Sequence, residues 1–218
     1  MKIVLILGMP GTGKSSVLNM ILQRFSNTAT AFSVRKYADY IIKKNPTSNL
    51  TKMILEERNN KGILTGNVIN QLAESFINAN KDLYEWLFIE NYPLSQKQLS
   101  FFKQLIETNG FRIQVINLCG PYYILEKRIQ ARIICPKCDK NSLIEPSFSN
   151  EYKICPNCGK QLVQRITYND DTIDRILNYE HKLKVVMANF ENMIVSYDTS
   201  KYTIAELYSV IIKYLEMT

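Results

Sequence analysis

Long apolar runs, repeats and low-complexity tracts are absent from this 218-residue sequence, and histidine occurs once. No apolar stretch approaches the length of a membrane-spanning helix, so we expect no membrane segment. The first apolar run is short and ends in a glycine-rich loop, unlike a signal peptide, which favours a cytoplasmic location. The one histidine, His181, has polar neighbours within a predicted helix, and we expect it to be exposed without a role in proton transfer. The chain is long enough for one globular domain with insertions.

Acidic residues are fewer than basic ones, with 20 Asp and Glu against 27 Lys and Arg and a formal net charge of +7. A basic surface favours a partner rich in phosphate. Nucleotides satisfy this preference, so the charge does not require a nucleic-acid partner.

Residues 8–15 read Gly-Met-Pro-Gly-Thr-Gly-Lys-Ser, directly after the apolar run 3–7 and before a helical pattern. This is a G-x-x-x-x-G-K-S loop in the strand-to-helix context that it requires. Glycines let the backbone wrap a phosphate, and the amides at the helix start point at the anion. Lys14 supplies charge for the β- and γ-phosphates, and the Ser15 hydroxyl is placed for Mg²⁺. The loop residues predicted to bind a nucleoside triphosphate are Gly8, Pro10, Gly11, Thr12, Gly13, Lys14, Ser15 and Ser16.

Short apolar segments alternate with helical patterns along the chain. Strands are predicted at 2–7, 86–89, 113–118 and 193–196, and helices at 14–25, 95–108, 122–132, 171–190 and 203–215. The stretch 34–79 is mainly helical, with breaks at 45–48 and 59–66. This alternation predicts an α/β fold with a parallel sheet covered by helices on both faces.

Four of the five cysteines form two C-P-x-C knuckles, Cys135 with Cys138 and Cys155 with Cys158. Two knuckles complete a tetrahedral Zn²⁺ site, and four thiolates leave no open position, so the metal is expected to be structural. Disulfides are the alternative, but a cytosolic chain disfavours them. The fifth, Cys119, is expected to be a small core residue near the end of a strand.

Arginines flank the cysteine segment. Arg128 and Arg132 precede it at i and i+4 on one helix, and Arg165 and Arg175 follow it. Four guanidinium groups around a zinc-braced flap are typical of a lid that neutralises transferring phosphates and excludes water. Ordinary surface arginines are the alternative interpretation.

Together these motifs resemble the adenylate kinases, and more broadly the nucleoside monophosphate kinases of the long form with a zinc-binding lid. The resemblance covers nearly the whole length. It includes the Gly-x-Pro-Gly-x-Gly-Lys loop, the two-arginine helix at 125–132, and the four cysteines with their spacing to Arg165. Arg175 with Tyr179 is similar to the family's later Arg-Leu-x-x-Tyr helix, and 62–66 resembles its acceptor-base loop.

The resemblance implies a P-loop NTPase core of residues 1–30, 80–132 and 166–218, a helical acceptor-binding insert of 31–79, and a zinc-binding lid of 133–165. It implies that ATP with Mg²⁺ is the donor, that Arg128 and Arg132 help to bind it, and that Ser15 and Glu90 face the Mg²⁺. The implied catalytic residues are Lys14, Arg128, Arg132, Arg165 and Arg175. The implied acceptor contacts are Ser33, Arg35, Leu64, Thr65, Gln98, Arg165 and Arg175. A monomer is expected.

The acceptor side departs from the family pattern. The family's Asp-Gly-Phe-Pro-Arg-Thr-x-x-Gln is Glu-Asn-Tyr-Pro-Leu-Ser-Gln-Lys-Gln at 90–98, so Leu94 replaces the arginine that grips the acceptor phosphate. The family's upstream aspartate and second arginine have no clear counterpart around 32–39, and the acids after the lid, Asp170 and Asp171, are displaced. Arg35, Lys36 or Lys97 are untested substitutes for the lost charge.

The sequence therefore predicts transfer of the ATP γ-phosphate to a nucleoside monophosphate, with AMP the leading candidate because of Gln98. The main alternative is a catalytically weak ATP-binding relative, or an NTPase, that acts through lid closure. A zinc-ribbon nucleic-acid binder is a third interpretation, but it leaves the phosphate loop unexplained.

Overall fold

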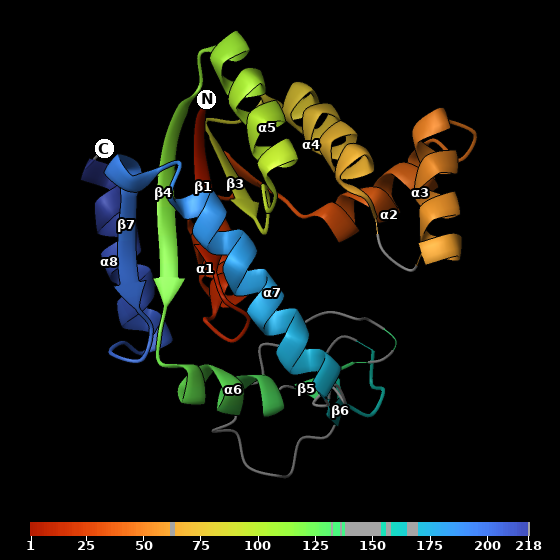
Figure 1. Ribbon diagram of the computed structural model, residues 1–218. Coiled ribbons are helices and arrows are strands. Elements are labelled where there is room, and N and C mark those ends of the chain that lie inside the picture. Colours follow the sequence, from red (N-terminus) through yellow and green to blue (C-terminus); the bar gives the residue numbers. More distant parts are fainter. Residues whose placement is uncertain are drawn as a thin grey trace.

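A five-stranded parallel sheet forms the centre of the protein (Figure 1). The computed structural model describes residues 1–61, 64–131, 133–135, 137, 154–155, 158–164 and 170–217. The strands are β1 (Lys2–Gly8), β2 (Ala29–Phe32), β3 (Trp86–Glu90), β4 (Arg112–Cys119) and β7 (Ile194–Asp198), in the order β2-β3-β1-β4-β7. Each neighbouring pair is parallel. The predicted α/β fold with a parallel sheet is confirmed.

Helices connect these strands and cover both faces of the sheet. They are α1 (Lys14–Arg24), α2 (Val34–Lys44), α3 (Asn49–Lys61), α4 (Gly66–Asn80), α5 (Gln96–Asn109), α6 (Tyr122–Gln130), α7 (Asp170–Met187) and α8 (Ile204–Met217). A short 3₁₀ turn, Glu191–Met193, precedes β7. Strands β5 (Ile133–Ile134) and β6 (Val163–Gln164) form a separate antiparallel pair.

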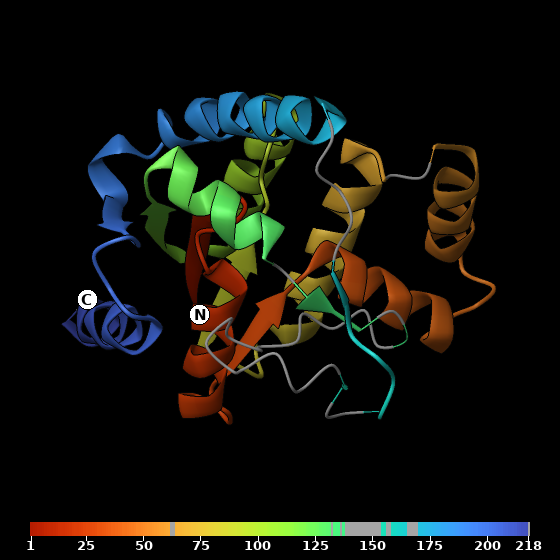
Figure 2. The same cartoon turned by 90° about the horizontal axis from the view of Figure 1, so that it is seen from below.

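Alternate residues of β1 enter two different apolar cores, as the two-residue period of a strand dictates. Ile3, Leu5 and Leu7 point to one face of the sheet, where they pack with residues of α2, α4, α5 and α7. Val4 and Ile6 pack on the opposite face with α1 and α8. Figure 2, seen from below, shows these layers, with α7 on one side of the sheet and α1 and α8 on the other. Helices thus cover the sheet on both faces.

The carboxyl ends of the parallel strands lie at one edge of the sheet, the lower edge in Figure 1, where α6 and the beginning of α7 are also found. The glycine-rich loop leaves β1 at this edge, beside the end of β3. Open α/β sheets bind their ligands at the carboxyl ends of the strands, where the strand order reverses. The fold therefore brings the predicted phosphate loop to the edge where a nucleotide site is expected.

One strand of the sheet differs from the sequence-based expectation. Strand β2 was not predicted, because Ala-Thr-Ala-Phe has no continuous apolar run, and its pairing with β3 places residues 31 and 32 in the sheet. The predicted insert began at residue 31, within this strand. Helix α5 does end as predicted, with Gly110 in the left-handed conformation at φ 63°. Among the described residues, no helix combines the length and the apolar character needed to cross a membrane.

Candidate functional site

The glycine-rich loop between β1 and α1 lies against the backbones of two neighbouring elements. A Cβ atom at Gly8 would collide with the carbonyl oxygen of Leu118 in β4, and Gly8 has a φ of 144°. A Cβ atom at Gly11 would lie 2.6 Å from the carbonyl oxygen of Leu125 in α6. Glycine is therefore required at both positions by close packing as well as by backbone conformation. The loop backbone therefore packs directly against the backbones of β4 and α6, which restricts its conformation.

The remaining predicted loop residues lie at the start of α1. Gly13 precedes the helix in the left-handed conformation, and the buried Thr12 donates its hydroxyl proton to the Met9 carbonyl at 2.8 Å. Pro10 and Ser16 are half-buried. The first amides of α1 have no intrahelical acceptor, so the loop presents backbone donors and the positive end of the helix dipole. This arrangement can bind a phosphate group.

The Lys14 side chain is buried against the same loop. Its ammonium donates to the carbonyl oxygens of Gly8 and Met9, at 2.7 and 2.9 Å. It also lies 5.9 Å from the ring centroid of Tyr179, within the range of a cation–π contact. These contacts hold one positive charge inside the loop, as the motif predicts.

Ser15, in the first turn of α1, and Glu90, at the end of β3, come together although they are 75 residues apart in the chain. The Ser15 hydroxyl lies 2.9 Å from Oε1 and 3.1 Å from Oε2 of Glu90, and donates to this carboxylate. A hydroxyl and a carboxylate are hard oxygen ligands, which Mg²⁺ prefers. The pair therefore fits the predicted Mg²⁺, and Ser15 and Glu90 are the side chains that would face it.

Asn91, directly after Glu90, links the end of β3 to helix α7. It has a φ of 61°, in the left-handed region. The Tyr179 hydroxyl of α7 donates to Asn91 Oδ1 at 2.6 Å, and Asn91 Nδ2 lies 3.4 Å from Glu90 Oε1. Burial, and secondarily the Glu90 charge, raise the pKa of Tyr179, so it is a neutral donor. The sequence motifs do not single out Asn91. Its one signal is that asparagine, which tolerates a positive φ, directly follows a predicted strand.

Arg128 lies beside the loop, on α6, and connects it to the segment after β7. Its guanidinium donates to the hydroxyl and the carbonyl of Thr199, both at 3.0 Å, and approaches the Gly11 carbonyl at 3.5 Å. Of the other predicted arginines, Arg132 and Arg165 lie outside the described residues. Arg175 lies on α7, but its side chain is outside the described part of the structure.

The predicted acceptor residues lie on the α2–α4 side of the molecule. Ser33 precedes α2 and Arg35 is exposed in its first turn. Gln98 is buried on α5, and its Oε1 accepts the Leu94 amide at 2.7 Å. Because Oε1 is engaged in this way, the Gln98 amide nitrogen is directed away from the Leu94 amide, close to Gly66. The half-buried Leu94 has no polar side-chain atom with which to bind a phosphate.

Glu57, which the sequence reasoning missed, fixes the predicted acceptor loop. Its carboxylate accepts the Thr65 amide at 2.6 Å and the Thr65 hydroxyl at 2.5 Å. Thr65 therefore has both of its donors engaged, and its hydroxyl oxygen can only accept from a ligand. The neighbouring Leu64 is half-buried. Glu57 lies on α3 and Thr65 directly before α4, so the two residues belong to different elements and no local pattern in the sequence indicates their contact.

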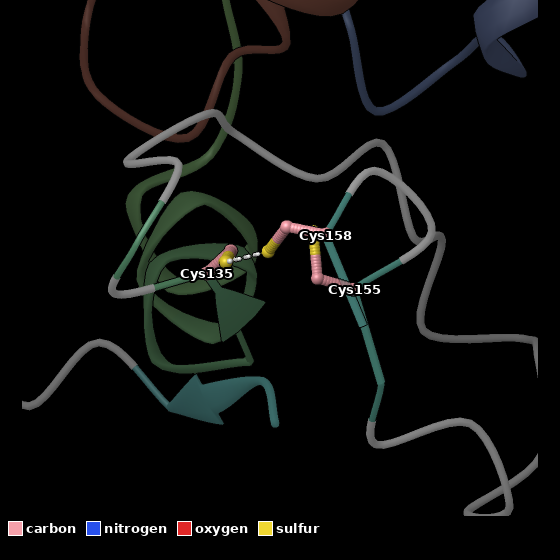
Figure 3. A group of neighbouring side chains, drawn as sticks. All are labelled: Cys135, Cys155 and Cys158. Atoms are coloured by element: carbon pink, nitrogen blue, oxygen red, sulfur yellow. Dashed lines mark hydrogen bonds between the residues drawn. The ribbon is translucent and has the colours of Figure 1, made fainter. Parts of the chain in front are cut away.

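Three of the four predicted zinc ligands form a cluster near the β5–β6 pair (Figure 3). The sulfur atoms of Cys135, Cys155 and Cys158 all lie within 4.8 Å of one another, and those of Cys135 and Cys158 are 3.5 Å apart. A tetrahedral zinc site with Zn–S bonds of about 2.3 Å places its sulfurs about 3.8 Å apart. The cluster therefore fits Zn²⁺, with Cys135 and Cys155 buried; Cys138 lies outside the described residues.

None of the described cysteines forms a disulfide. Cys119, expected in the core, is instead half-buried at the end of β4, where its thiol contacts the Tyr197 carbonyl at 3.4 Å. Burial, with the nearby Asp198 charge, raises the pKa of this thiol, so it stays protonated. His181 is exposed, as predicted.

Comparison with known proteins finds similarity to several bacterial proteins named adenylate kinase. The chain is 24% identical to the adenylate kinase of Thermotoga maritima over 199 residues, which cover 91% of this chain and 86% of the relative. It is 25% identical to the adenylate kinase of Thermoanaerobacter sp. over 207 residues, covering 91% of each. Identity to the adenylate kinase of Caldanaerobacter subterraneus is 26% over 208 residues, covering 91% of this chain and 89% of the relative.

No family model matches the chain. The pairwise similarities nevertheless extend across the core, the α2–α4 segment and the cysteine cluster, and the parallel sheet and phosphate loop agree with them. The chain is therefore a distant relative of the adenylate kinases, similar to them over about nine tenths of its length.

Proposed function

We propose that this protein is a nucleoside monophosphate kinase, which transfers the γ-phosphate of ATP to a nucleoside monophosphate. The observation that carries the proposal is the meeting of Lys14, Ser15 and Glu90 at one glycine-rich loop. A buried ammonium, a hydroxyl and a carboxylate at the start of a helix provide what a magnesium-bound triphosphate requires. The relatives named adenylate kinase support the same reaction class.

In this reaction an oxygen of the acceptor phosphate attacks the γ-phosphorus in line. The bond from the γ-phosphorus to the β–γ bridging oxygen breaks, and two nucleoside diphosphates result. No protein nucleophile is needed, because catalysis consists of positioning and charge neutralisation. Magnesium, when bound, supplies charge neutralisation at the phosphates. Lys14 binds the donor phosphates, and the loop amides orient them.

Arginines complete the proposed donor site. Arg128 is fastened to Thr199 beside the loop, where its planar guanidinium can contact the donor nucleotide. Arg132, Arg165 and Arg175 are proposed to neutralise the transferring phosphate when a lid of residues 133–165 closes on the core. The cysteine cluster is proposed to hold one structural Zn²⁺ that braces this lid.

AMP is the leading candidate acceptor, with an altered site for its phosphate. The buried Gln98, the Thr65 loop and Gly66 are proposed to contact the base, and Ser33 and Arg35 to lie near the phosphate. Leu94 favours the alternative proposal, a weak ATP-binding relative or NTPase, because an apolar side chain there cannot bind the acceptor phosphate.

An acceptor screen separates these two proposals. ATP and Mg²⁺ are incubated with the protein and each common ribo- or deoxyribonucleoside monophosphate, and diphosphate products are measured by chromatography. We expect one monophosphate to give two diphosphates for each ATP consumed, which are two ADP if the acceptor is AMP, and one ADP with one other diphosphate if it is not. ATP consumption at the same rate with and without every monophosphate would support the NTPase alternative and contradict the kinase.

A further inference from the structure

Tyr179 and Asn91 have no task in the proposed phosphoryl transfer, yet they form a series of contacts that leads to Glu90. Its members come from helix α7 and from the end of strand β3, and 88 residues separate Tyr179 from Asn91. This series of contacts ends at the Glu90 carboxylate, which accepts a hydrogen bond from the Ser15 hydroxyl of the phosphate loop. A side-chain link into a metal-facing carboxylate can determine where that carboxylate lies.

The Tyr179 hydroxyl determines how the Asn91 amide is oriented. At 2.6 Å, the phenol donates to Asn91 Oδ1, so the amide nitrogen of Asn91 is directed toward Glu90 Oε1, at 3.4 Å. The opposite orientation would place the amide oxygen against the carboxylate and the amide nitrogen against the phenol oxygen. Tyr179 therefore selects the orientation in which Asn91 offers a donor to Glu90. The contact between Asn91 Nδ2 and Glu90 Oε1 is long for a hydrogen bond, so it acts mainly through the attraction between the amide dipole and the carboxylate charge.

Asn91 gives Glu90 a donor that is independent of Ser15. Both oxygens of Glu90 receive the Ser15 hydroxyl in this structure. Ser15 is also the loop residue whose oxygen faces the proposed Mg²⁺, and a hydroxyl can offer a lone pair to a cation while it donates its proton to a carboxylate. The Asn91 amide approaches Glu90 Oε1, the oxygen nearer to Ser15, from a separate element, so the position of this carboxylate does not depend on Ser15 alone.

The Tyr179 ring also lies beside the phosphate loop, near Lys14. Its ring centroid lies 5.9 Å from the Lys14 ammonium, and the ring is half-buried between α7 and the loop. One side chain of α7 thus contacts the loop lysine and, through Asn91, the metal-facing carboxylate. Arg175, proposed to bind the transferring phosphate, lies one helical turn earlier on the same helix.

From this geometry we propose that Tyr179 and Asn91 are positioning residues that fix the Glu90 carboxylate, so that tight binding of ATP as its magnesium complex depends on them. This inference rests on the proposed function, because it assumes that the loop binds ATP. The contact orients Glu90 and takes no direct part in the transfer of phosphate.

Calorimetry with a non-hydrolysable ATP analogue tests the inference without using activity. Binding is measured in Mg²⁺ and in EDTA for the parent, for Tyr179→Phe, for Asn91→Gly and for the double variant. Tyr179→Phe keeps the ring beside Lys14, and Asn91→Gly suits the positive φ at that position. Tyr37→Phe is the matched control, because it also removes a bonded hydroxyl, 3.1 Å from Ser75 Oγ, but in the α2–α4 contact.

We expect each single variant to lose about three- to tenfold in affinity in Mg²⁺, the effect of one ordinary hydrogen bond, because the contact to the carboxylate is long. In EDTA the affinity should stay within about twofold of the parent, and the control should match the parent in both conditions. The double variant should lose no more than the worse single variant, because both substitutions break one chain of contacts. Melting temperatures should be unchanged, since glycine relieves the backbone at residue 91.

Three results would overturn the inference while leaving the proposed function intact. These are parent-like binding by all variants, equal losses in Mg²⁺ and EDTA, and additive losses in the double variant. Failure of the parent itself to bind the analogue would overturn the proposed function as well as the inference.

Discussion

At the scale of single residues, short polar contacts hold both sides of the site, but only the donor side keeps all the charged residues that the motif predicts. Lys14 is bound by two loop carbonyls, and Ser15 by the Glu90 carboxylate. Arg128 is tied to Thr199 by two bonds of 3.0 Å. Leu94, in contrast, offers only an apolar side chain where the family has a phosphate-binding arginine. Substitutions on the two sides therefore have different expected consequences.

Lys14→Ala tests the donor site. It removes the buried ammonium that neutralises the β- and γ-phosphates, so we expect turnover to fall at least about a hundredfold. The measurement is coupled ADP release with the best acceptor from the screen. Lys2→Ala is a suitable control, because its ammonium packs on the Trp86 ring at the opposite end of β1. Activity of the Lys14 variant within about threefold of the parent would contradict the assignment.

Leu94→Arg tests whether the acceptor site is an AMP site that lacks one contact. A guanidinium bond to phosphate contributes about 1.5–3 kcal/mol, which corresponds to a KM for AMP lower by tenfold or more. We expect a change below about threefold, because Arg35 and Lys36 at the start of α2 bring positive charge from a different element. A tenfold gain, with no other monophosphate used better by the parent, would instead indicate a weakened AMP site.

At the scale of elements, the zinc cluster and the helix ends are the features whose removal should be visible without an activity assay. The cluster joins the end of β5 to the turn before β6, and the two strands also pair with each other. Helix α8 begins with a capping box, in which Thr203 and Glu206 each bond the other's backbone amide.

The metal prediction is one tightly held Zn²⁺ per chain. Elemental analysis of protein purified without chelators should find it, and Cys155→Ser should lower the melting temperature because the ligand set is incomplete. Cys119→Ser is the matched control, since Cys119 lies on β4 away from the cluster. Absence of zinc in protein with intact thiols would refute the prediction.

The capping box of α8 predicts a pH-dependent loss of stability. Thr203→Ala removes the cap, and we expect about 1 kcal/mol less stability by denaturant unfolding at neutral pH. The Thr203 backbone amide, and secondarily its hydroxyl, hold the pKa of Glu206 below its usual value. The variant keeps the amide bond, so only the hydroxyl's bond to the carboxylate is present above the ordinary carboxyl range and lost as pH falls. The difference from the parent should therefore shrink in acid, whereas Ser209→Ala on the same helix should show little effect at either pH.

Local signals in the sequence explain which parts of this structure could be predicted. Strand β1 and the phosphate loop are contiguous, and Gly110 marks the end of α5 through its own conformation. Strand β2 could not be predicted, because its four residues become a strand only by pairing with β3. The Glu57–Thr65 and Tyr179–Asn91 contacts join residues of different elements, so only the folded chain brings them together.

At the scale of the whole molecule, similarity to adenylate kinases extends over nine tenths of the chain at about a quarter identity. The sheet, the loop and the cysteine cluster agree with this relationship. Most of the departures from the family pattern that the sequence shows lie between β2 and α5, around the proposed acceptor, and one more lies after the proposed lid, at Asp170 and Asp171. The relationship therefore supports the class of reaction, and the acceptor screen is needed to identify the substrate.

Helix α7 has an uneven environment along its length. Leu183 and Val186 are buried in the core, whereas Leu177 is 53% exposed. Amide hydrogen exchange across residues 177–187 should therefore be graded, slowest near Val186 and fastest near Leu177. Because Tyr179 lies in the faster part and contacts both Lys14 and Asn91, a bound nucleotide should slow exchange there and flatten the gradient. The exchange rate in this part of α7 would therefore report whether the phosphate loop is occupied, while the buried end of the helix serves as an internal reference.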